Sequence, residues 1–326
     1  MKTKVLSMLR NGKSYVSGQE ICNELGVSRT AVWKCMNQLK EEGYTIEAIS
    51  NKGYCLVDSP NIIKDYEVKS ILGKLGMLDD IIYYDEIDST NTKAKKLGSE
   101  EDHRQLLLVA DQQTAGRGRR GRAWSSPKGT NIAMSYMLHP EIAPQNASRI
   151  TLITALALVE AIRKVTSLDA LIKWPNDIII EGHKVCGILT EMSSESDYIH
   201  YVVVGIGINV NGKDFPEEIQ KIATSLYIEG KQEVKRSVLL AEVIKSFEKY
   251  YTNFLETEDL DNVTQEYNSF LVHRDKKVKV ISGSDVTEGK ALGIDREGSL
   301  LIELSDGTIK HVISGEVSVR GINGYV

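Results

Sequence analysis

The spacing of apolar residues changes twice along the 326-residue chain, and this change constrains the fold more than any other feature. Near the start, apolar residues recur three and four positions apart, as on helices that bury one face. Helical stretches then alternate with short apolar runs of strand length, and after residue 270 only short strand-like runs remain. A chain of this length suits two or three domains. We therefore expect an α+β protein with domains at residues 1–61, 62–270 and 271–326.

The first domain has the pattern of a winged helix-turn-helix. Two helical stretches are separated by a break at Gly26, as in helix-turn-helix motifs. Ser28 is suited to cap the second helix, because its hydroxyl can accept a hydrogen bond from a free backbone N–H. Gly43 ends that helix, and two strand-like runs around the turn at residues 50–53 then predict a hairpin, the wing.

The second helix of this pair would expose donors suited to phosphates and base edges. Residues 1–57 carry eight Lys and Arg against five acids, a net charge of +3, whereas the whole chain carries −5 and the remainder therefore −8. A basic module on an acidic body favours an anionic partner for that module. A plain helical bundle with a hairpin is the alternative. The residues expected to bind DNA are Ser28, Arg29, Thr30, Trp33, Lys34, Asn37 and Lys52.

The composition, 41% apolar and 26% charged, is that of a globular protein. No apolar stretch approaches the roughly 20 residues that span a bilayer, and the first residues lack the apolar core of a signal peptide. We expect a cytoplasmic protein without a membrane partner. The four cysteines and six histidines show no metal-binding spacing, so no metal site built by the protein is expected.

The central domain contains a segment rich in glycine and arginine, Gly116–Arg122. Its glycines fit the dinucleotide-binding fingerprint, but that fingerprint opens a helix directly after a strand, and here more loop residues follow. Four arginines in seven residues favour a loop that closes over an anion, since guanidinium groups bind phosphate and carboxylate with paired donors. A nucleic-acid-binding patch and a solvated loop are the alternatives.

Three other polar segments adjoin predicted strands: Asp88–Asn91, Lys173–Asp177 with Lys184 downstream, and Val204–Asn211. Taken singly, the first two are typical of a helix N-cap and an Asx turn. The third contains glycines that indicate close approach of a ligand to a strand. Residues 207–213 have P-loop spacing, but Asp214 stands where a Mg²⁺-binding hydroxyl is needed, so we reject a P-loop.

Together and in this order, the motifs resemble those of the biotin–protein ligases. The segments that carry the resemblance are Asp88–Asn91, Gln113–Arg119, Lys173–Asp177 with Lys184, and Val204–Asn211. Two N-terminal segments, Ser28–Lys34 and Asn51–Tyr54, resemble the repressor-type members, the bifunctional ligase/biotin operon repressors. The resemblance covers nearly the whole chain, including Gly289–Asp295. It implies a winged helix-turn-helix, a central mixed sheet of the class II synthetase type, and a C-terminal SH3-like β-barrel.

The resemblance also implies an activity. The enzyme would make biotinyl-5′-AMP from biotin and ATP, with Mg²⁺ arriving on the ATP, and transfer biotin to a lysine of a biotin carboxyl carrier protein. As a homodimer in the adenylate-bound state, it would bind operator DNA and repress genes for biotin synthesis and transport. Three rivals are a lipoate-type ligase on the same core, a non-enzymatic ligand-sensing repressor, and an RNA-binding protein.

The same resemblance assigns residues to the site. Those implied for biotin are Ser89, Thr90, Asn91, Gln113, Arg117, Gly118, Arg119 and Lys184. Those implied for the nucleotide are Arg119, Trp124, Asn176, Asp177 and Asn209, and the catalytic set is Lys184, Arg119 and Asp177. A carboxylate must attack an anionic phosphate, so cations are needed to offset the repulsion. Lys173 adds a further cation, and a closing loop would exclude water.

Overall fold

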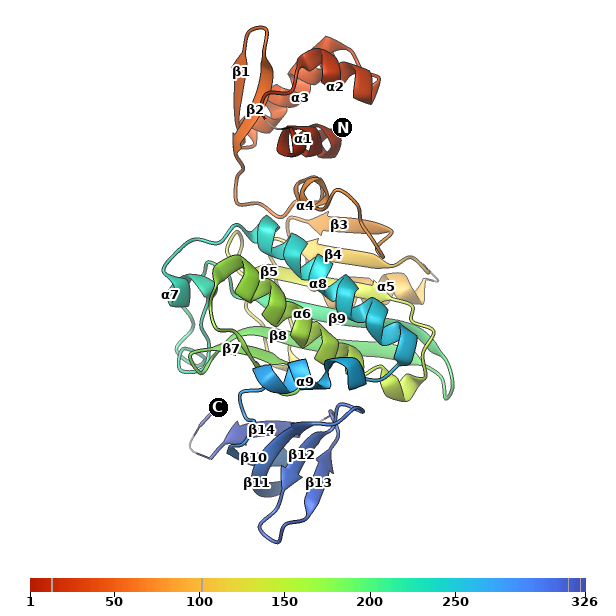
Figure 1. The fold of residues 1–326 in the computed structure, drawn as a ribbon, viewed down its shortest axis with the longest axis vertical. Helices are drawn as coiled ribbons and strands as arrows, with labels where there is room; N and C mark the ends of the chain where they lie inside the picture. Colours follow the sequence, from red (N-terminus) through yellow and green to blue (C-terminus); the bar gives the residue numbers. More distant parts are fainter. Residues whose placement is uncertain (13, 101, 316, 323) are drawn as a thin grey trace.

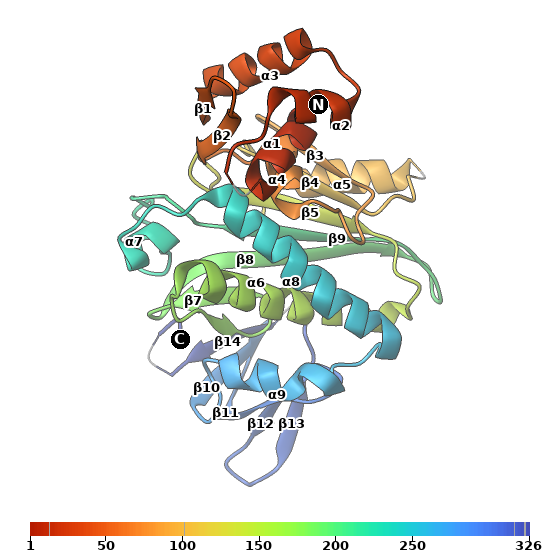
Figure 2. The ribbon, with the colours of Figure 1, turned by 45° about the horizontal axis from the view of Figure 1, so that its top comes forward.

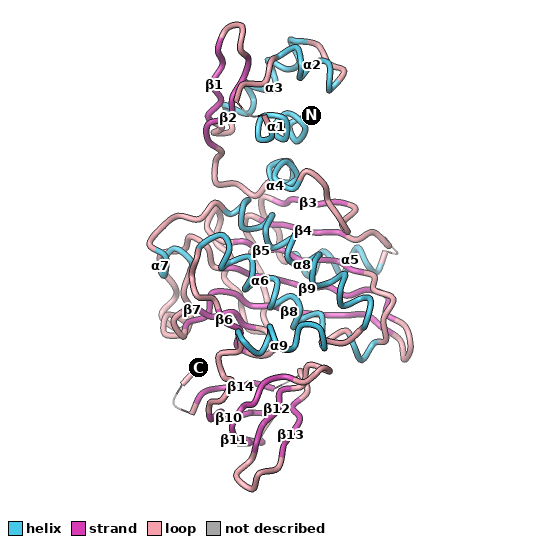
Figure 3. Tube along the Cα trace, viewed as in Figure 1, coloured by secondary structure: helices cyan, strands magenta, loops and turns pink. Residues whose placement is uncertain are grey.

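The computed structural model describes residues 1–12, 14–100, 102–315, 317–322 and 324–326. Figure 1 shows three parts along the longest axis: an N-terminal helical module with a hairpin, a large central sheet covered by helices, and a small sheet at the other end. The predicted α+β class is confirmed, and the division of the chain into strands and helices is also visible in Figure 3. Among the described residues, no helix has the length and apolar character needed to cross a membrane.

The N-terminal module is the predicted winged helix-turn-helix. Its elements are α1 (Lys2–Asn11), α2 (Gly18–Leu25), α3 (Arg29–Glu41), β1 (Thr45–Ile49) and β2 (Gly53–Asp58). The Ser17 hydroxyl accepts from the Glu20 amide at 3.0 Å and so caps α2, which Gly26 ends with a φ of 65°. One face of α3 is buried, as predicted from its spacing, and β1 pairs with β2 in an antiparallel hairpin.

The central sheet has seven strands in the order β3-β4-β5-β9-β8-β7-β6. These are β3 (Asp80–Tyr84), β4 (Leu106–Ala110), β5 (Ile132–Leu138), β6 (Leu171–Lys173), β7 (Asp177–Ile180), β8 (His183–Ser194) and β9 (Ile199–Ile208). β3 and β4 are parallel, whereas the other neighbours are antiparallel. The sheet is therefore mixed, as the resemblance of the motifs implies.

Helices cover the two faces of this sheet unequally. The helices of this region are α4 (Asp65–Leu72), α5 (Thr90–Ser99), α6 (Arg149–Thr166), α7 (Leu226–Gly230), α8 (Arg236–Thr257) and α9 (Asp261–Phe270). Figures 1 and 2 show α6 and α8 side by side across one face. Alternate residues of β9, such as Val204 and Ile206, join the core on that side, whereas Val203 packs in a smaller cluster with Ala94 of α5. The face turned toward α5 is thus less filled, which leaves room for a site.

The small sheet after α9 is antiparallel, with the order β13-β12-β11-β10-β14. Its strands are β10 (Lys277–Ser282), β11 (Asp285–Ile294), β12 (Leu300–Glu303), β13 (Ile309–Val312) and β14 (Val317–Gly321). It stands where the sequence predicts a small barrel. The sequence pattern does not predict β14, because this strand is five residues long and half-buried in most of its positions.

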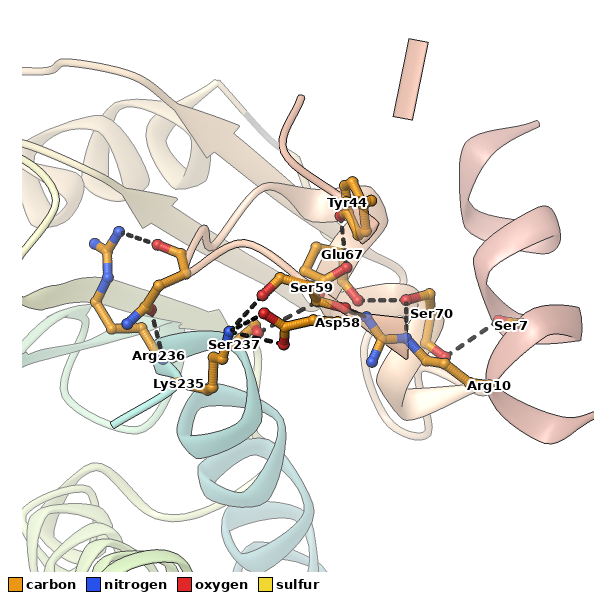
Figure 4. Close-up of polar contacts among 11 residues, drawn as sticks. Ser7, Arg10, Tyr44, Asp58, Ser59, Glu67, Ser70, Lys235, Arg236 and Ser237 are labelled. Carbon is orange, nitrogen blue, oxygen red and sulfur yellow. Dashed lines mark hydrogen bonds and ion pairs between the residues drawn. The ribbon is translucent and has the colours of Figure 1, made fainter. Parts of the chain in front are cut away.

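A buried carboxylate joins the N-terminal module to the central part, as Figure 4 shows. Glu67 of α4 is fully buried; it accepts from Arg10 of α1 at 2.6 Å and from the Tyr44 hydroxyl at 2.6 Å, and Ser237 of α8 lies 3.4 Å away. Burial, with the adjacent Glu67 carboxylate, raises the pKa of Tyr44, so its hydroxyl stays a donor. A buried charge is tolerated when it is paired and hydrogen-bonded in this way.

The connection between β2 and α4 is also anchored to the central part. Asn61 accepts from the Arg236 amide at 2.9 Å through its side chain, and its carbonyl accepts from the Arg236 guanidinium at 2.9 Å. Arg236 is itself buried, pairs with Asp111 at 2.7 Å and donates to the Asn131 carbonyl. Lys235 pairs with Asp58 nearby (Figure 4). Asn61, the last residue of the predicted first domain, is thus bonded to the body that follows it.

Candidate active site

One cavity of about 250 Å³ lies between the central sheet, the arginine-rich loop and the edge of the small sheet. All the residues that the sequence assigns to biotin or nucleotide line it: Ser89, Thr90, Asn91, Gln113, Arg117, Gly118, Arg119, Trp124, Asn176, Asp177, Lys184 and Asn209. Apart from Trp124, these residues come from four separate motifs. The fold therefore brings together every predicted small-molecule contact, although the role of each one stays a prediction.

Two glycines of β9 form part of the cavity wall. A Cβ atom on Gly205 would overlap the side-chain amide of Asn91, and one on Gly207 would overlap the Trp124 indole. Both glycines face away from the core formed by Val204 and Ile206. The glycine spacing in this strand therefore lets the Asn91 and Trp124 side chains lie directly against its backbone. Close approach of a ligand to the same strand stays a prediction.

The end of the cavity next to α5 is a network of polar groups. Ser89 caps α5, accepting from the Thr92 amide at 3.4 Å. The amide and hydroxyl of Thr90 donate to Gln113 Oε1 at 2.8 and 3.0 Å. Ser135 Oγ, in the middle of β5, lies 2.6 Å from both Thr90 Oγ1 and Asn91 Oδ1. Sequence reasoning missed Ser135, although a serine within an otherwise apolar run, Ile132–Leu138, was a usable signal.

The opposite end holds an ion pair in a cluster of cations. Lys184 Nζ lies 2.5 Å from Asp177 Oδ1, and the lysine side chain is 23% exposed to the cavity side. Burial alone would raise the pKa of Asp177, but the charges of Lys184 and Lys173 outweigh it and lower that pKa. Burial lowers the pKa of Lys173 to about 8, with Asp177 opposing the shift and Lys184, Arg320 and Arg119 adding to it. The cluster carries more positive than negative charge, as an anion site requires.

Arg119 connects the basic loop to two other segments. Its guanidinium donates to Asn176 Oδ1 at 2.7 Å, to the Val317 carbonyl at 3.1 Å, and to the Gly315 carbonyl. The loop itself contains a single 3₁₀ turn, Arg119–Gly121, and is closed by a bond from the Gly118 amide to the Arg122 carbonyl. The predicted catalytic arginine thus lies between the sheet and the C-terminal part.

The other residues predicted to bind the nucleotide, Trp124, Asn176 and Asn209, also line the cavity. Trp124 lies over β9, with the Lys184 ammonium 5.4 Å from its ring centroid, and its indole N–H has no hydrogen-bond partner among the described residues. Asn176 and Asn209 are buried and donate to the carbonyls of Ile188 and Thr224. These two amides therefore also fix the backbone around the cavity.

Sequence reasoning missed the C-terminal contribution to the cavity. Residues 317–320 of β14 and Tyr325 line it. The Tyr325 hydroxyl donates to Asp177 Oδ2 at 2.6 Å, and Lys173 Nζ lies 4.3 Å from the centroid of its ring. No local motif marks these residues, because their place depends on how the small sheet packs against the central one. No group of three or more His, Cys, Asp or Glu suited to a metal occurs in the part of the chain that is described.

The residues predicted to bind DNA lie on α3 and in the wing. Arg29, Thr30, Trp33 and Lys34 are exposed, and Trp33 is 57% exposed despite its size. Asn37 is half-buried, and Lys52 is exposed in the turn between β1 and β2. The Ser28 hydroxyl accepts from the Ala31 amide at 3.2 Å, so it caps α3, as predicted. The structure thus gathers the predicted set on one helix and the wing.

The fold and the site together define a protein ligase of the biotin and lipoate class joined to a DNA-binding module. Residues 83–209 match the biotin/lipoate A/B protein ligase family, residues 2–55 match the HTH domain, and residues 273–320 match the biotin protein ligase C-terminal domain. The predicted helix-turn-helix and ligase parts are confirmed by these matches.

Relatives extend the likeness over the whole chain. The bifunctional ligase/repressor BirA of Bacillus subtilis (strain 168) is 39% identical over 310 residues, 94% of this chain and 95% of its own length. The protein of the same name from Escherichia coli (strain K12) is 31% identical over 97% of this chain and 96% of its own length. The chain therefore belongs to the family of bifunctional biotin ligase/repressors, as its motifs predict.

Solved structures support the same assignment. The biotin protein ligase of Aquifex aeolicus in complex with biotin and ATP is 33% identical, with a TM-score of 0.67 and coverage of 74% of this chain and 99% of that one. The predicted enzyme class, biotin–protein ligase, is that of the family. The lipoate-type ligase and the non-enzymatic sensor, kept as alternatives from the sequence, are disfavoured by the full-length likeness to ligase/repressors.

Proposed function

We propose that the cavity of this biotin–protein ligase joins biotin to ATP and then transfers biotin to a lysine of a biotin carboxyl carrier protein. The observation that carries the proposal is the ion pair of Lys184 and Asp177, which lines the cavity among further cations, Lys173 and Arg119, beside the polar network around Thr90. One end of the cavity suits a polar, uncharged group, and the other suits anions.

In the first step, a carboxylate oxygen of biotin attacks the α-phosphorus of ATP. The new bond joins that oxygen to phosphorus, the bond to the oxygen that bridges to the β-phosphate breaks, and pyrophosphate leaves. Biotin is held by Ser89, Thr90, Asn91 and Gln113, with Arg117 and Gly118 at the mouth. Lys184 and Arg119 stabilise the negative charge that develops on the phosphate in the transition state. Such electrostatic stabilisation is usually the largest contribution of a site to catalysis.

Mg²⁺ enters this scheme bound to ATP. Both oxygens of Asp177 are already engaged, one by Lys184 and the other by Tyr325, and the neighbouring groups are cationic. This donor set does not form a cage for a divalent ion, which prefers several oxygen ligands. Asn176 and Asp177 would therefore contact the nucleotide and its bound ion without enclosing the ion. Trp124 and Asn209 line the adenylate end of the cavity.

In the second step, the neutral amine of the carrier lysine attacks the carbonyl carbon of biotinyl-AMP. A C–N bond forms, the C–O bond to the phosphate breaks, AMP leaves with the electron pair, and the surplus proton of the nitrogen passes to solvent. Asp177 orients the amine. The arginine-rich loop limits the access of water, which would otherwise hydrolyse the mixed anhydride.

The test is ATP-dependent transfer of labelled biotin to a carrier domain. Lys184→Ala should lower the rate by about 10²–10³, the usual effect of removing one charge-stabilising donor. Lys164→Ala is the matched control, because Lys164 pairs with Glu242 on the outer helices. Wild-type levels of transfer by Lys184→Ala would contradict the assigned role. Lipoate in place of biotin should give no labelled carrier.

The same transfer assay can test the predicted domain boundaries, 1–61, 62–270 and 271–326, with deletion variants. Removing residues 1–57 should leave transfer measurable, because the cavity contains no residue of the N-terminal module. Removing residues 1–61 should be more damaging, because it also removes the bonds of Asn61 to Arg236. Equal activity of the two deletion variants would show that the bonds between Asn61 and Arg236 do not support the ligase part.

We also propose that the chain represses biotin genes as a homodimer that binds operator DNA when biotinyl-AMP is present. The exposed set on α3 supports DNA binding, and two such modules in a symmetric dimer would read two half-sites. Lys34→Ala should weaken binding to a promoter fragment of the biotin genes and lower its salt dependence by about one charge. Unchanged affinity and salt dependence would contradict the proposed interface.

A further inference from the structure

Tyr325 reaches the cavity from a part of the chain that the ligase motifs do not include. It follows β14, the edge strand that pairs with β10. Gly321 at the end of β14 lies so close to the backbone of Val326 that a Cβ atom there would overlap it. Tyr325 lies at the central sheet, where it contacts Asp177 and Lys173.

Tyr325 holds the second oxygen of the buried carboxylate. Lys184 Nζ contacts Asp177 Oδ1 at 2.5 Å, and the Tyr325 hydroxyl donates to Asp177 Oδ2 at 2.6 Å. Burial, followed by the negative charge of Asp177, raises the pKa of Tyr325, so the hydroxyl keeps its proton and remains a donor. The carboxylate is thus fixed between one cation from the sheet and one neutral donor from the C-terminal segment.

The ring of Tyr325 has a second contact. Lys173 Nζ lies 4.3 Å from the ring centroid, within the range of a cation–π interaction. Lys173 is almost fully buried, and Asp177 is the acid that acts on its charge. The tyrosine therefore contacts both Asp177, through its hydroxyl, and Lys173, through its ring.

We propose that Tyr325 is a positioning residue for the transfer step, which holds Asp177 in place after Lys184 has turned to the phosphate of biotinyl-AMP. This inference rests on the proposed function. In the structure, Lys184 and Tyr325 share the carboxylate. Once the phosphate attracts Lys184, Oδ1 becomes available for the carrier amine, and Tyr325 alone prevents Asp177 from rotating.

The first half-reaction and the second should therefore respond differently to the loss of the hydroxyl. Adenylate formation needs the cations, which Tyr325→Phe leaves in place with the ring still over Lys173. Amine transfer needs a fixed Asp177. A merely structural role of Tyr325 would instead slow both half-reactions together.

The experiment measures the two half-reactions separately with the full chain. Biotin-dependent exchange of pyrophosphate with ATP reports the first, and single-turnover transfer from preformed biotinyl-AMP to a carrier domain reports the second. Tyr325→Phe should lower the transfer rate at saturating carrier by about tenfold, the usual effect of losing a hydrogen bond to a charged group, with KM for the carrier and the exchange rate unchanged. Tyr325→Ala should slow transfer at least as much.

Tyr198→Phe is the matched control, because Tyr198 is 56% exposed at the distant β8–β9 turn and does not line the cavity. Transfer by Tyr325→Phe at the wild-type rate would overturn the proposal, and so would equal slowing of exchange and transfer. Failure of the proposed function has a different signature, since the wild-type chain would then show neither exchange nor transfer. Thermal unfolding of each variant checks that the fold is kept.

Discussion

At the scale of single residues, burial decides which side chains of the cavity are charged. Lys173 and Lys184 both end in ammonium groups near Asp177, but only Lys173 is almost fully buried. The same chemical group therefore serves two purposes. Lys184 is the more exposed of the two and can leave its partner for a ligand, whereas Lys173 is held in place by the surrounding residues.

This difference predicts a pH effect. Burial lowers the pKa of Lys173 to about 8, so the side chain is charged below that pH and neutral above it. Because ATP is an anion, kcat/KM for ATP should fall as the pH rises through about 8, by about tenfold for the loss of one charged donor. Lys173→Arg should not show this step, since arginine stays protonated. A wild-type profile that is flat between pH 7 and 9 would contradict the assigned charge.

The glycines of β9 predict a steric effect. An alanine at Gly207 would place its Cβ within the Trp124 indole. Overpacking of this kind costs about 1–3 kcal/mol, and displacement of Trp124 should raise KM for ATP by about tenfold. Gly230→Ala is the control, because the nearest atom to its Cβ lies at an ordinary 3.5 Å. Equal KM values for the two variants would show that Trp124 does not contribute to nucleotide binding.

At the scale of elements, α4 is the support on which the N-terminal module rests. It packs against α1 on one side and α8 on the other, and its Glu67 bonds to Arg10 and Tyr44 of the module (Figure 4). α4 thus connects the N-terminal module to the ligase part. The orientation of α3, the helix proposed to bind DNA, therefore depends on contacts outside the helix-turn-helix motif itself.

Removal of this carboxylate should be costly. Glu67→Ala leaves the Arg10 charge without its carboxylate partner and the buried Tyr44 hydroxyl without its acceptor, and breaking a buried pair costs about 3–5 kcal/mol. Denaturant unfolding should show this loss, and protease should cut faster between residues 58 and 64. Glu47→Ala, which removes an exposed partner of Tyr15, should change neither reading. Similar unfolding midpoints for the two variants would disprove the role of Glu67 as an anchor.

At the scale of the whole molecule, the ligase cavity and the DNA-binding surface lie in separate parts of one chain (Figure 1). A ligand in the cavity can affect DNA binding only if it favours one state of the whole molecule over another. Because contacts with α4 hold the N-terminal module in place, two modules in a symmetric dimer would stay at a constant distance from each other. The dimer is then the simplest state that a bound ligand could favour.

Sedimentation velocity tests this link. The dimer fraction should increase when biotin and ATP are added together, because the adenylate stabilises the state that binds it better. Biotin alone or ATP alone is the matched control and should have a smaller effect. Promoter-fragment affinity should rise in parallel. An unchanged dimer fraction, with adenylate formation verified in the same sample, would rule out ligand-driven dimerisation.

The sequence by itself determined the fold class, the helix-turn-helix with its wing, and most strands of the central sheet, because these depend on local apolar spacing, caps and turns. It also determined which motif residues meet in the cavity, through the order of four segments that resemble one family. β4 and β5 are examples of such strands, since each is a largely apolar run bounded by more polar segments.

Only the tertiary structure decided the rest. Tyr325 and Arg320 enter the site because the small sheet packs beside β7, and no local pattern contains that contact. From the sequence, Glu67 cannot be distinguished from an exposed polar residue of a helix. It is buried only because α1 and α8 pack against α4. The pKa of Lys173 is lowered chiefly by burial, which also depends on how remote segments pack. Burial and pairing between remote segments are properties of the packed chain, so spacing along the sequence cannot reveal them.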